Sequence, residues 1–211
     1  MTTESGSGIQ IEFADAWDNP RHTRYIWPAV DINMVLANHY RANMPTRLTR
    51  TMLWEAEVRK AWQPDIYLPS VVREDSVQSW SEEATARSEI MARWSEQRCW
   101  LAPNNYALVL ERAQIDHVRQ IITFLGLAEM HGPDSKVISA QPLRQSLFHV
   151  EHSVGGSESR PLNQWRVVHL TDRPDDRLVQ VSERWSKEPR LGEFLEIYIR
   201  RDLRRELTYL D

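Results

Sequence analysis

Two short stretches of alternating apolar and polar residues, separated by a glycine- and serine-rich break, constrain the fold of this chain more than any other feature. They are residues 146–154 (SLFHVEHSV) and 163–170 (NQWRVVHL). A side-chain period of two is typical of a half-buried β-strand, and Gly, Ser and Pro between two such runs are typical of a turn. The sequence therefore predicts a β-hairpin in this region.

The apolar residues also predict the register of this hairpin. A turn centred on Ser159 makes one face apolar, because apolar residues of the two strands then meet: Phe148 with Leu170, and Val150 with Val168. The opposite face carries two opposed histidines and a carboxylate: His149, His169 and Glu151. A shift by one residue would mix the two faces, so we expect the register that keeps one face apolar.

Residues 177–185 (RLVQVSERW) extend the pattern into a third strand after the turn TDRPDD. Pairing of this strand with the second one adds Gln180 and Arg184 to the polar face, beside Trp165. We expect helices to cover that face, because apolar helical stripes earlier in the chain need a surface to pack on. A covered polar face is a natural place for a ligand cavity.

The rest of the chain is predicted to be mainly helical. Apolar residues recur at three- and four-residue spacing in five segments: 29–43, 46–62, 75–100, 112–127 and 188–207. Short strands are expected at 9–13 and within 101–111. Residues 1–8 are expected to be a disordered tail and residues 9–211 a single α+β domain. In that domain a helical N-terminal half packs on a C-terminal antiparallel meander, which a long C-terminal helix closes.

This order of elements resembles two known layouts. START-like folds also place a meander before a long C-terminal helix, and SnoaL-like folds also place helices before a curved sheet. The resemblance is one of layout and rests on no shared motif. Both families enclose ligand cavities, so the resemblance implies a cavity between sheet and helices, while any function must be argued from the side chains.

Composition excludes several classes of protein. A net charge of −4 argues against a nucleic-acid partner. No apolar run approaches the length of a membrane span. The single cysteine, Cys99, excludes an intrachain disulfide and a cysteine-based zinc site, and we expect a packed thiol there. The N-terminus does not resemble a signal peptide, so we expect a cytoplasmic protein, either monomeric or a homo-oligomer.

The predicted site has two groups of residues. His149, His169 and Glu151 are the candidate acid–base groups, and Trp165, Gln180 and Arg184 are the candidate substrate-binding groups. Histidine titrates near neutrality, and an arginine or amide can hold a developing oxyanion. This set predicts an enzyme of isomerase, dehydratase or cyclase type that uses no metal or cofactor. Its ligand would be a small apolar or aromatic molecule in a cavity lined by some of the nine tryptophans.

Three alternatives remain open. The same cavity would suit a non-catalytic carrier of an apolar ligand. Two histidines and a carboxylate are also the ligand set of mononuclear metal enzymes, so His149, His169 and Glu151 would suit a metal site. A structural or interaction protein is favoured if the polar face meets water. Outside this region, Glu55 and Glu57 are interpreted as surface charges, with Glu55 placed to pair with Arg59.

Overall fold

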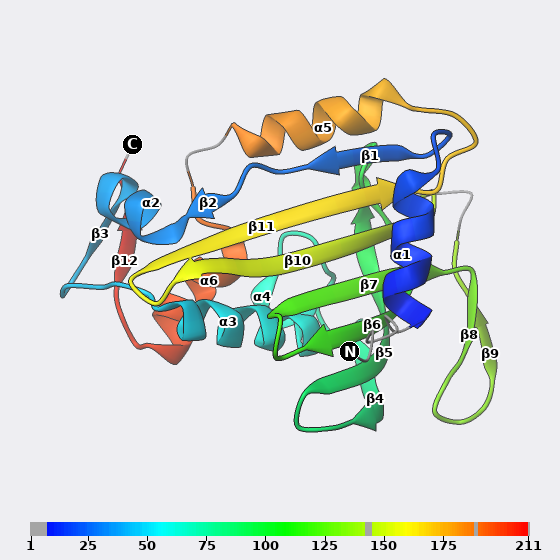
Figure 1. Ribbon diagram of the computed structural model, residues 1–211, viewed down its shortest axis with the longest axis horizontal. Coiled ribbons are helices and arrows are strands. Elements are labelled where there is room, and N and C mark those ends of the chain that lie inside the picture. Colours follow the sequence, from blue (N-terminus) through cyan, green and yellow to red (C-terminus); the bar gives the residue numbers. More distant parts are fainter. Residues whose placement is uncertain (1–7, 142–144, 188–189, 211) are drawn as a thin grey trace, which may run out of the picture.

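The computed structural model describes residues 8–141, 145–187 and 190–210, and it is built on a large, strongly twisted antiparallel sheet (Figure 1). Its strands follow one another in the order β1 (Thr23–Ile26), β11 (Arg160–His169), β10 (Phe148–Ser157), β7 (Ile121–Leu127), β6 (Ala102–Asp116), β5 (Ser88–Cys99) and β4 (Gln78–Ala84). The short strand β2 (Val30–Asp31) also pairs with β11. Two small sheets lie beside the large one: β3 (Tyr40–Ala42) with β12 (Leu207–Tyr209), and β8 (Glu129–His131) with β9 (Val137–Ser139).

Helices cover both faces of the large sheet. One face packs against α3 (Arg50–Trp62) and α6 (Glu193–Ile197), which continues as the π-helical turn η1 (Tyr198–Asp202). We call this face of the sheet the α3 face. The other, the α1 face, packs against α1 (Gly8–Asp18) (Figure 1). The remaining helices are α2 (Ile32–His39), α4 (Pro64–Tyr67) and α5 (Asp176–Ser186), which runs along the edge strand β1.

Neighbouring residues of the sheet belong to different cores. Phe124 and its neighbours on the α3 face join a large apolar core with α2, α3 and α6. Leu125 and Val168 point the other way and pack against Ile9 and Phe13 of α1. Because successive side chains of a strand point to opposite faces, each central strand contributes to both cores.

Several predicted elements are confirmed. The chain combines helices with a large antiparallel sheet, and the hairpin is formed by β10 and β11. The helix predicted at 46–62 is α3, which begins after Thr49, whose hydroxyl accepts a hydrogen bond from the backbone N–H of Met52 at 3.0 Å. The helix predicted at 29–43 is present in shorter form, as α2. The long C-terminal helix predicted at 188–207 is wrong, because only the short elements α6 and η1 are helical among its described residues and Leu207 begins β12. Residues 188 and 189, like residues 1–7 of the predicted tail, lie outside the described residues.

The helices predicted at 75–100 and 112–127 are wrong, because β4, β5, β6 and β7 occupy these segments. The sheet therefore begins well before the C-terminal meander. In β5, Arg93, Ser95 and Gln97 alternate with other side chains and are buried on the α3 face. These inward-facing polar residues hide the period of two that normally identifies a strand.

Two predicted strands are helices. Residues 177–185 lie in α5, so the three-strand meander is wrong. Asp175 caps this helix, since its carboxylate accepts from the backbone N–H of Arg177 at 3.0 Å. Residues 9–13 lie in α1, where Ile9 and Phe13 are one turn apart and both buried.

The predicted register of the hairpin is also wrong, by one residue. Phe148 pairs with His169 and Val150 with Val167, because the turn has only two residues between Ser157 and Arg160. Next to this turn Gly156 has φ +75°, and a Cβ there would lie 2.1 Å from the carbonyl oxygen of Arg160. A tight turn that needs glycine thus fixes the pairing, in place of the apolar pattern.

Candidate functional site

The observed register divides the predicted site between two faces. His149 and Glu151 point to the α1 face, whereas His169 and Trp165 point to the α3 face. Gln180 and Arg184 lie on α5 and are exposed. His149 and His169 therefore cannot share one metal ion or act on one substrate atom.

His149 is buried in an apolar environment on the α1 face. Its side chain is 2 % exposed, and its Nδ1 accepts a hydrogen bond from the backbone N–H of Gly126 at 3.1 Å. Burial lowers the pKa of His149 to about 4, so the imidazole is neutral at pH 7. Nearby Glu151 is held by two guanidinium nitrogens of Arg166, at 2.8 and 2.9 Å. These contacts place Glu151 in a two-pronged ion pair.

His169 lies on the α3 face, at the other end of the hairpin from the turn. The residue is 1 % exposed, and neither ring nitrogen has a hydrogen-bond partner among the described residues. The ring packs edge-on against Trp100, with centroids 4.9 Å apart, and against Phe148 at 5.8 Å. Burial lowers the pKa of His169 to about 4, so this imidazole is also neutral at pH 7.

A group of buried charged and polar side chains lies between α3 and the sheet. We call Glu57, Lys60, His152, Asn163 and Trp165 the Glu57 cluster. Glu57 and Lys60 are one turn apart on α3, and their side chains, 0 % and 2 % exposed, form an ion pair. The other carboxylate oxygen of Glu57 accepts from the Asn163 amide at 2.6 Å and from the Trp165 indole N–H at 3.1 Å. His152 Nδ1 lies 3.2 Å from Glu57 Oε2.

Aromatic rings enclose the Glu57 cluster. The Lys60 ammonium lies 4.2 Å from the centre of the Trp165 ring and 4.0 Å from that of Phe194. His152 stacks on Trp165, with ring centroids 4.5 Å apart. The faces of these rings attract the cation and exclude water, so the charges interact in a dry environment.

A second buried ion pair extends the polar region along the sheet. Arg93 Nε donates to Glu111 Oε2 at 2.8 Å, and Gln97 donates to the same oxygen at 3.1 Å. Arg93 also donates to the backbone carbonyl of Ala61 in α3. This pair connects the helix to β5 and β6.

The charges of the Glu57 cluster shift one another's titration. Burial alone would raise the pKa of Glu57, but Lys60 and His152 together hold it well below its usual range. Burial lowers the pKa of Lys60 to about 8, although Glu57 opposes this shift. Burial and the nearby ammonium lower the pKa of His152 to about 4. At pH 7 the cluster therefore combines a carboxylate, an ammonium and a neutral imidazole.

A series of aromatic rings leads from the surface to the Glu57 cluster. Trp185 on α5 is 50 % exposed, and its ring lies 5.0 Å from Trp100. Trp100 lies 6.4 Å from Trp27, which lies 6.4 Å from Trp165. The sequence predicts a cavity lined by some of the tryptophans, with Trp165 as a substrate-binding residue, whereas these four tryptophans pack against one another.

The sequence interpretation missed the main members of this cluster. It predicts a surface charge at Glu57, whereas this residue is fully buried. Glu55 is the surface charge, paired with Arg59 at 2.6 Å as expected. The missed signal is the spacing of Leu53, Glu57 and Lys60, which share one helical face that is buried in the structure. Cys99 is buried, in agreement with a packed thiol.

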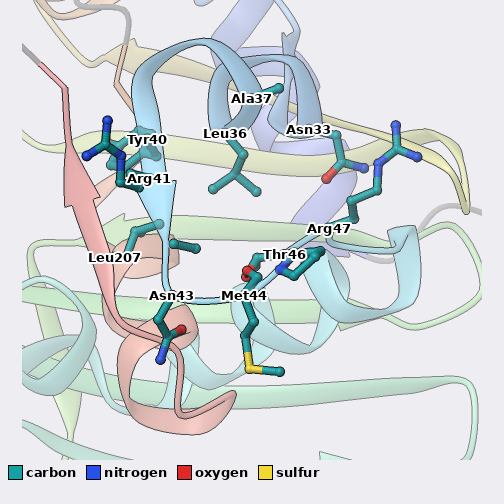
Figure 2. A pocket seen from close by; sticks show the side chains of 12 residues that line it. Asn33, Leu36, Ala37, Tyr40, Arg41, Asn43, Met44, Thr46, Arg47 and Leu207 are labelled. Atoms are coloured by element: carbon teal, nitrogen blue, oxygen red, sulfur yellow. The ribbon is translucent and has the colours of Figure 1, made fainter.

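A separate pocket of about 510 Å³ opens at the surface beside α2 (Figure 2). Its walls come from α2, β3, residues 43–47 and the start of β12. None of its residues belongs to the Glu57 cluster.

The described residues contain no group of three or more His, Cys, Asp or Glu side chains placed to hold a metal ion. The expected alternative of a 2-His-1-carboxylate site at His149, His169 and Glu151 fails because the two histidines project from opposite faces. In the same parts of the chain, no helix is long and apolar enough to cross a membrane.

No family model and no curated protein matches this chain. Among solved structures it is similar to the ZhuI aromatase/cyclase from Streptomyces sp. R1128, with 10 % identity, 85 % of this chain and 94 % of that chain covered, and a TM-score of 0.42. It is also similar to major latex-like protein 151 from Panax ginseng (11 % identity, 79 % and 96 % covered, TM-score 0.44). A third similar structure is a protein from Thermus thermophilus, TTHA0849 (9 % identity, 87 % and 97 % covered, TM-score 0.40). These likenesses assign no activity to this chain.

Proposed function

We propose that this protein is a small-molecule enzyme that transfers protons without a metal, of isomerase, dehydratase or cyclase type, and that its reactive centre is the Glu57 cluster. One observation carries the proposal: a carboxylate, an ammonium and a neutral imidazole are buried together against aromatic rings. Titratable groups whose pKa values are pushed apart in a dry site are typical of acid–base catalysis. The centre thus moves from the predicted His149, His169 and Glu151 to a neighbouring set of residues.

Each group in the cluster has a distinct role in this proposal. Glu57 faces Nδ1 of His152 and favours the tautomer with its proton on that nitrogen, which leaves Nε2 as the base that takes a proton from the substrate. The ammonium of Lys60 stabilises negative charge that develops on a substrate oxygen. Asn163 and Trp165 hold the carboxylate in place through their hydrogen bonds.

The aromatic series supports an apolar or aromatic substrate. A flat molecule can replace the ring contacts between Trp185, Trp100 and Trp27 at little cost, because stacking is similar for most rings. Entry requires α5 to move away from the sheet. That helix packs along β1, the strand at the edge of the sheet.

The principal competitor is a carrier that uses the same aromatic region and leaves its ligand unchanged. A carrier needs the rings but has no use for a buried base beside an ammonium. The two functions therefore differ at His152, which a carrier would tolerate losing.

The proposal is tested with the ligand that co-purifies with the native protein, identified by mass spectrometry. We expect an apolar or aromatic compound that the protein converts, with kcat lowered about 10²–10⁴-fold in His152→Gln. The matched control is His149→Gln, a buried histidine of the same strand that faces α1. An unchanged ligand, or full turnover in His152→Gln, would contradict acid–base catalysis at this cluster.

A further inference from the structure

We infer that the surface pocket beside α2 is a binding site for an organic anion with an apolar body. This inference does not rest on the proposed enzyme, since the pocket shares no residue with the Glu57 cluster. It rests on the shape of the pocket, on its rigid frame and on two arginines at its rim.

The pocket has the size and lining of a small-molecule site. Its volume of about 510 Å³ lies within the usual range for such sites, roughly 300–1,000 Å³. The apolar part of the lining is formed by Leu36, Ala37, Tyr40, Met44, Pro45 and Leu207. An alkyl or aromatic body of a ligand would bury this surface.

Hydrogen bonds hold the walls in place without a ligand. Asn33 of α2 is buried, donates to the carbonyl of Leu48 at 2.9 Å and accepts from the N–H of Leu48 at 2.9 Å. On the opposite side β12 pairs with β3, and the N–H of Glu206 donates to the Asn43 side chain at 3.2 Å. A preformed pocket loses little conformational entropy when it binds a ligand.

Two arginines give the opening a positive charge. Arg41 and Arg47 lie on opposite sides of the pocket (Figure 2), and both are exposed. Within the described part of the chain, neither guanidinium has an ion pair or a side-chain hydrogen bond, whereas the nearby acids Asp31 and Glu196 are paired with other arginines. The opposing charge nearest in sequence to the lining is Glu206, an exposed residue whose backbone N–H donates to Asn43. Two uncommitted guanidiniums against one carboxylate favour an anionic ligand.

The chemistry of these groups defines the ligand class. A guanidinium matches the two oxygens of a carboxylate, sulfate or phosphate in a planar, two-pronged contact. The apolar floor excludes a small inorganic anion as the complete ligand. We therefore assign the pocket to a monoanionic or dianionic organic acid whose body is an alkyl chain or a ring.

The inference is tested by calorimetric titration with octanoate, with 1-octanol as the neutral probe of the same length. We expect saturable binding of octanoate and much weaker binding of octanol. Arg41→Gln and Arg47→Gln should each weaken octanoate binding about three- to tenfold, the usual worth of a partly exposed charged contact. Ala37→Glu, which places a carboxylate on the exposed part of the floor, should abolish it.

Two matched controls are available. Asn38→Glu adds the same carboxylate to the next exposed residue of α2, which does not line the pocket. Arg173→Gln removes an exposed arginine from the loop before α5. Both should bind octanoate within about twofold of the wild type, because neither change alters a residue that lines the pocket.

Three results would overturn the inference. The first is binding of octanol as tight as that of octanoate, and the second is full affinity for octanoate in the double variant Arg41→Gln/Arg47→Gln. The third is binding to phosphatidylglycerol vesicles without binding of free octanoate, which would assign the arginines to a lipid surface instead. Circular dichroism of each variant establishes that the compared proteins are folded.

Discussion

The two faces of the β10–β11 hairpin bury histidine in opposite ways. His149 lies on the α1 face among apolar residues, with a single backbone hydrogen bond. His152, three residues later, lies on the α3 face between Glu57 and the ring of Trp165. An odd separation along a strand is enough to give two identical side chains different electrostatic environments. The partners across the core, more than the motif HVEH, therefore decide what a histidine can do.

Burying the side chains of the α3 face also costs more free energy than burying those of the α1 face. Two charges removed from water cost several kcal/mol each, and their attraction offsets this cost only when the geometry is good and the remaining oxygens are hydrogen-bonded. Glu57 meets that condition at Oε1, which accepts from Asn163 and Trp165, while its Oε2 contacts Lys60 only as an ion pair. Apolar residues in place of Glu57 and Lys60 would stabilise the fold as well as the ion pair does. This is a reason to assign a function to the α3 face.

The largest expected effect is on the α3 face. Glu57→Leu leaves the buried Lys60 without its counter-charge and should lower the free energy of unfolding by about 3–5 kcal/mol. The double variant Glu57→Leu/Lys60→Met should recover most of that loss, because both charges are then gone. Urea unfolding of the two variants checks this, with Glu55→Leu on the exposed side of α3 as the control. Equal losses in the single and double variants would mean that the pair is not coupled.

A pH-dependent effect, shared by both faces, is expected in acid. The folded-state pKa of His149, His152 and His169 is about 4, below the ordinary value of 6.5. The unfolded chain therefore binds more protons between pH 6.5 and 4, so stability is full above pH 6.5 and falls as the pH drops through this window. Each histidine contributes a slope of up to about 1.4 kcal/mol per pH unit.

Substitution separates these contributions by face. Between pH 4 and 6.5, His149→Gln should reduce the slope of the free energy of unfolding against pH by the contribution of one proton. The double variant His152→Gln/His169→Gln should reduce the same slope by the contribution of two protons. Urea unfolding at a series of pH values measures the slope. An unchanged slope in His149→Gln would show that the imidazole on the α1 face is accessible to protons in the folded state.

The smallest effect is expected at Glu151, on the α1 face. Its ion pair with Arg166 is partly exposed, with side-chain exposures of 15 % and 36 %. Glu151→Gln should therefore cost less than about 1 kcal/mol. A loss as large as that of Glu57→Leu, measured by the same unfolding experiment, would remove the energetic difference between the two faces.

The same contrast explains which parts of the fold the sequence predicts. An element whose apolar residues face one core, such as α3, has a readable period and can be predicted, and the β10–β11 hairpin is recognisable from its turn residues. In β5 the buried residues on the α3 face include Arg93, Ser95 and Gln97, so the polar cluster itself conceals the strand. The sheet cannot be recognised there until the partners of these residues are known.

The candidate site shows the same limit. The sequence identifies the histidines around HVEH as candidates but leaves open whether their face is covered or meets water, and the register depends on a two-residue turn next to Gly156. Glu57 lies 95 residues before His152 in the sequence, and nothing in either segment indicates that they meet. Only the packing of α3 on the hairpin brings base, carboxylate and ammonium together.

The central claim is that aromatic ligands reach the Glu57 cluster, and labelling of the Lys60 amine in that cluster tests it most directly. Lys60, Lys136 and Lys187 are the three lysines of the chain, and the last two are exposed. The protein is treated with 2-naphthaldehyde and cyanoborohydride over a range of pH, and each lysine is followed by peptide mass spectrometry. Because the pKa of Lys60 is about 8, we predict that at pH 7.5 Lys60 is labelled faster than Lys136 and Lys187. As the pH rises, the labelling rate of Lys60 should reach half of its maximum near pH 8. Labelling of Lys136 and Lys187 with none at Lys60 would contradict the account.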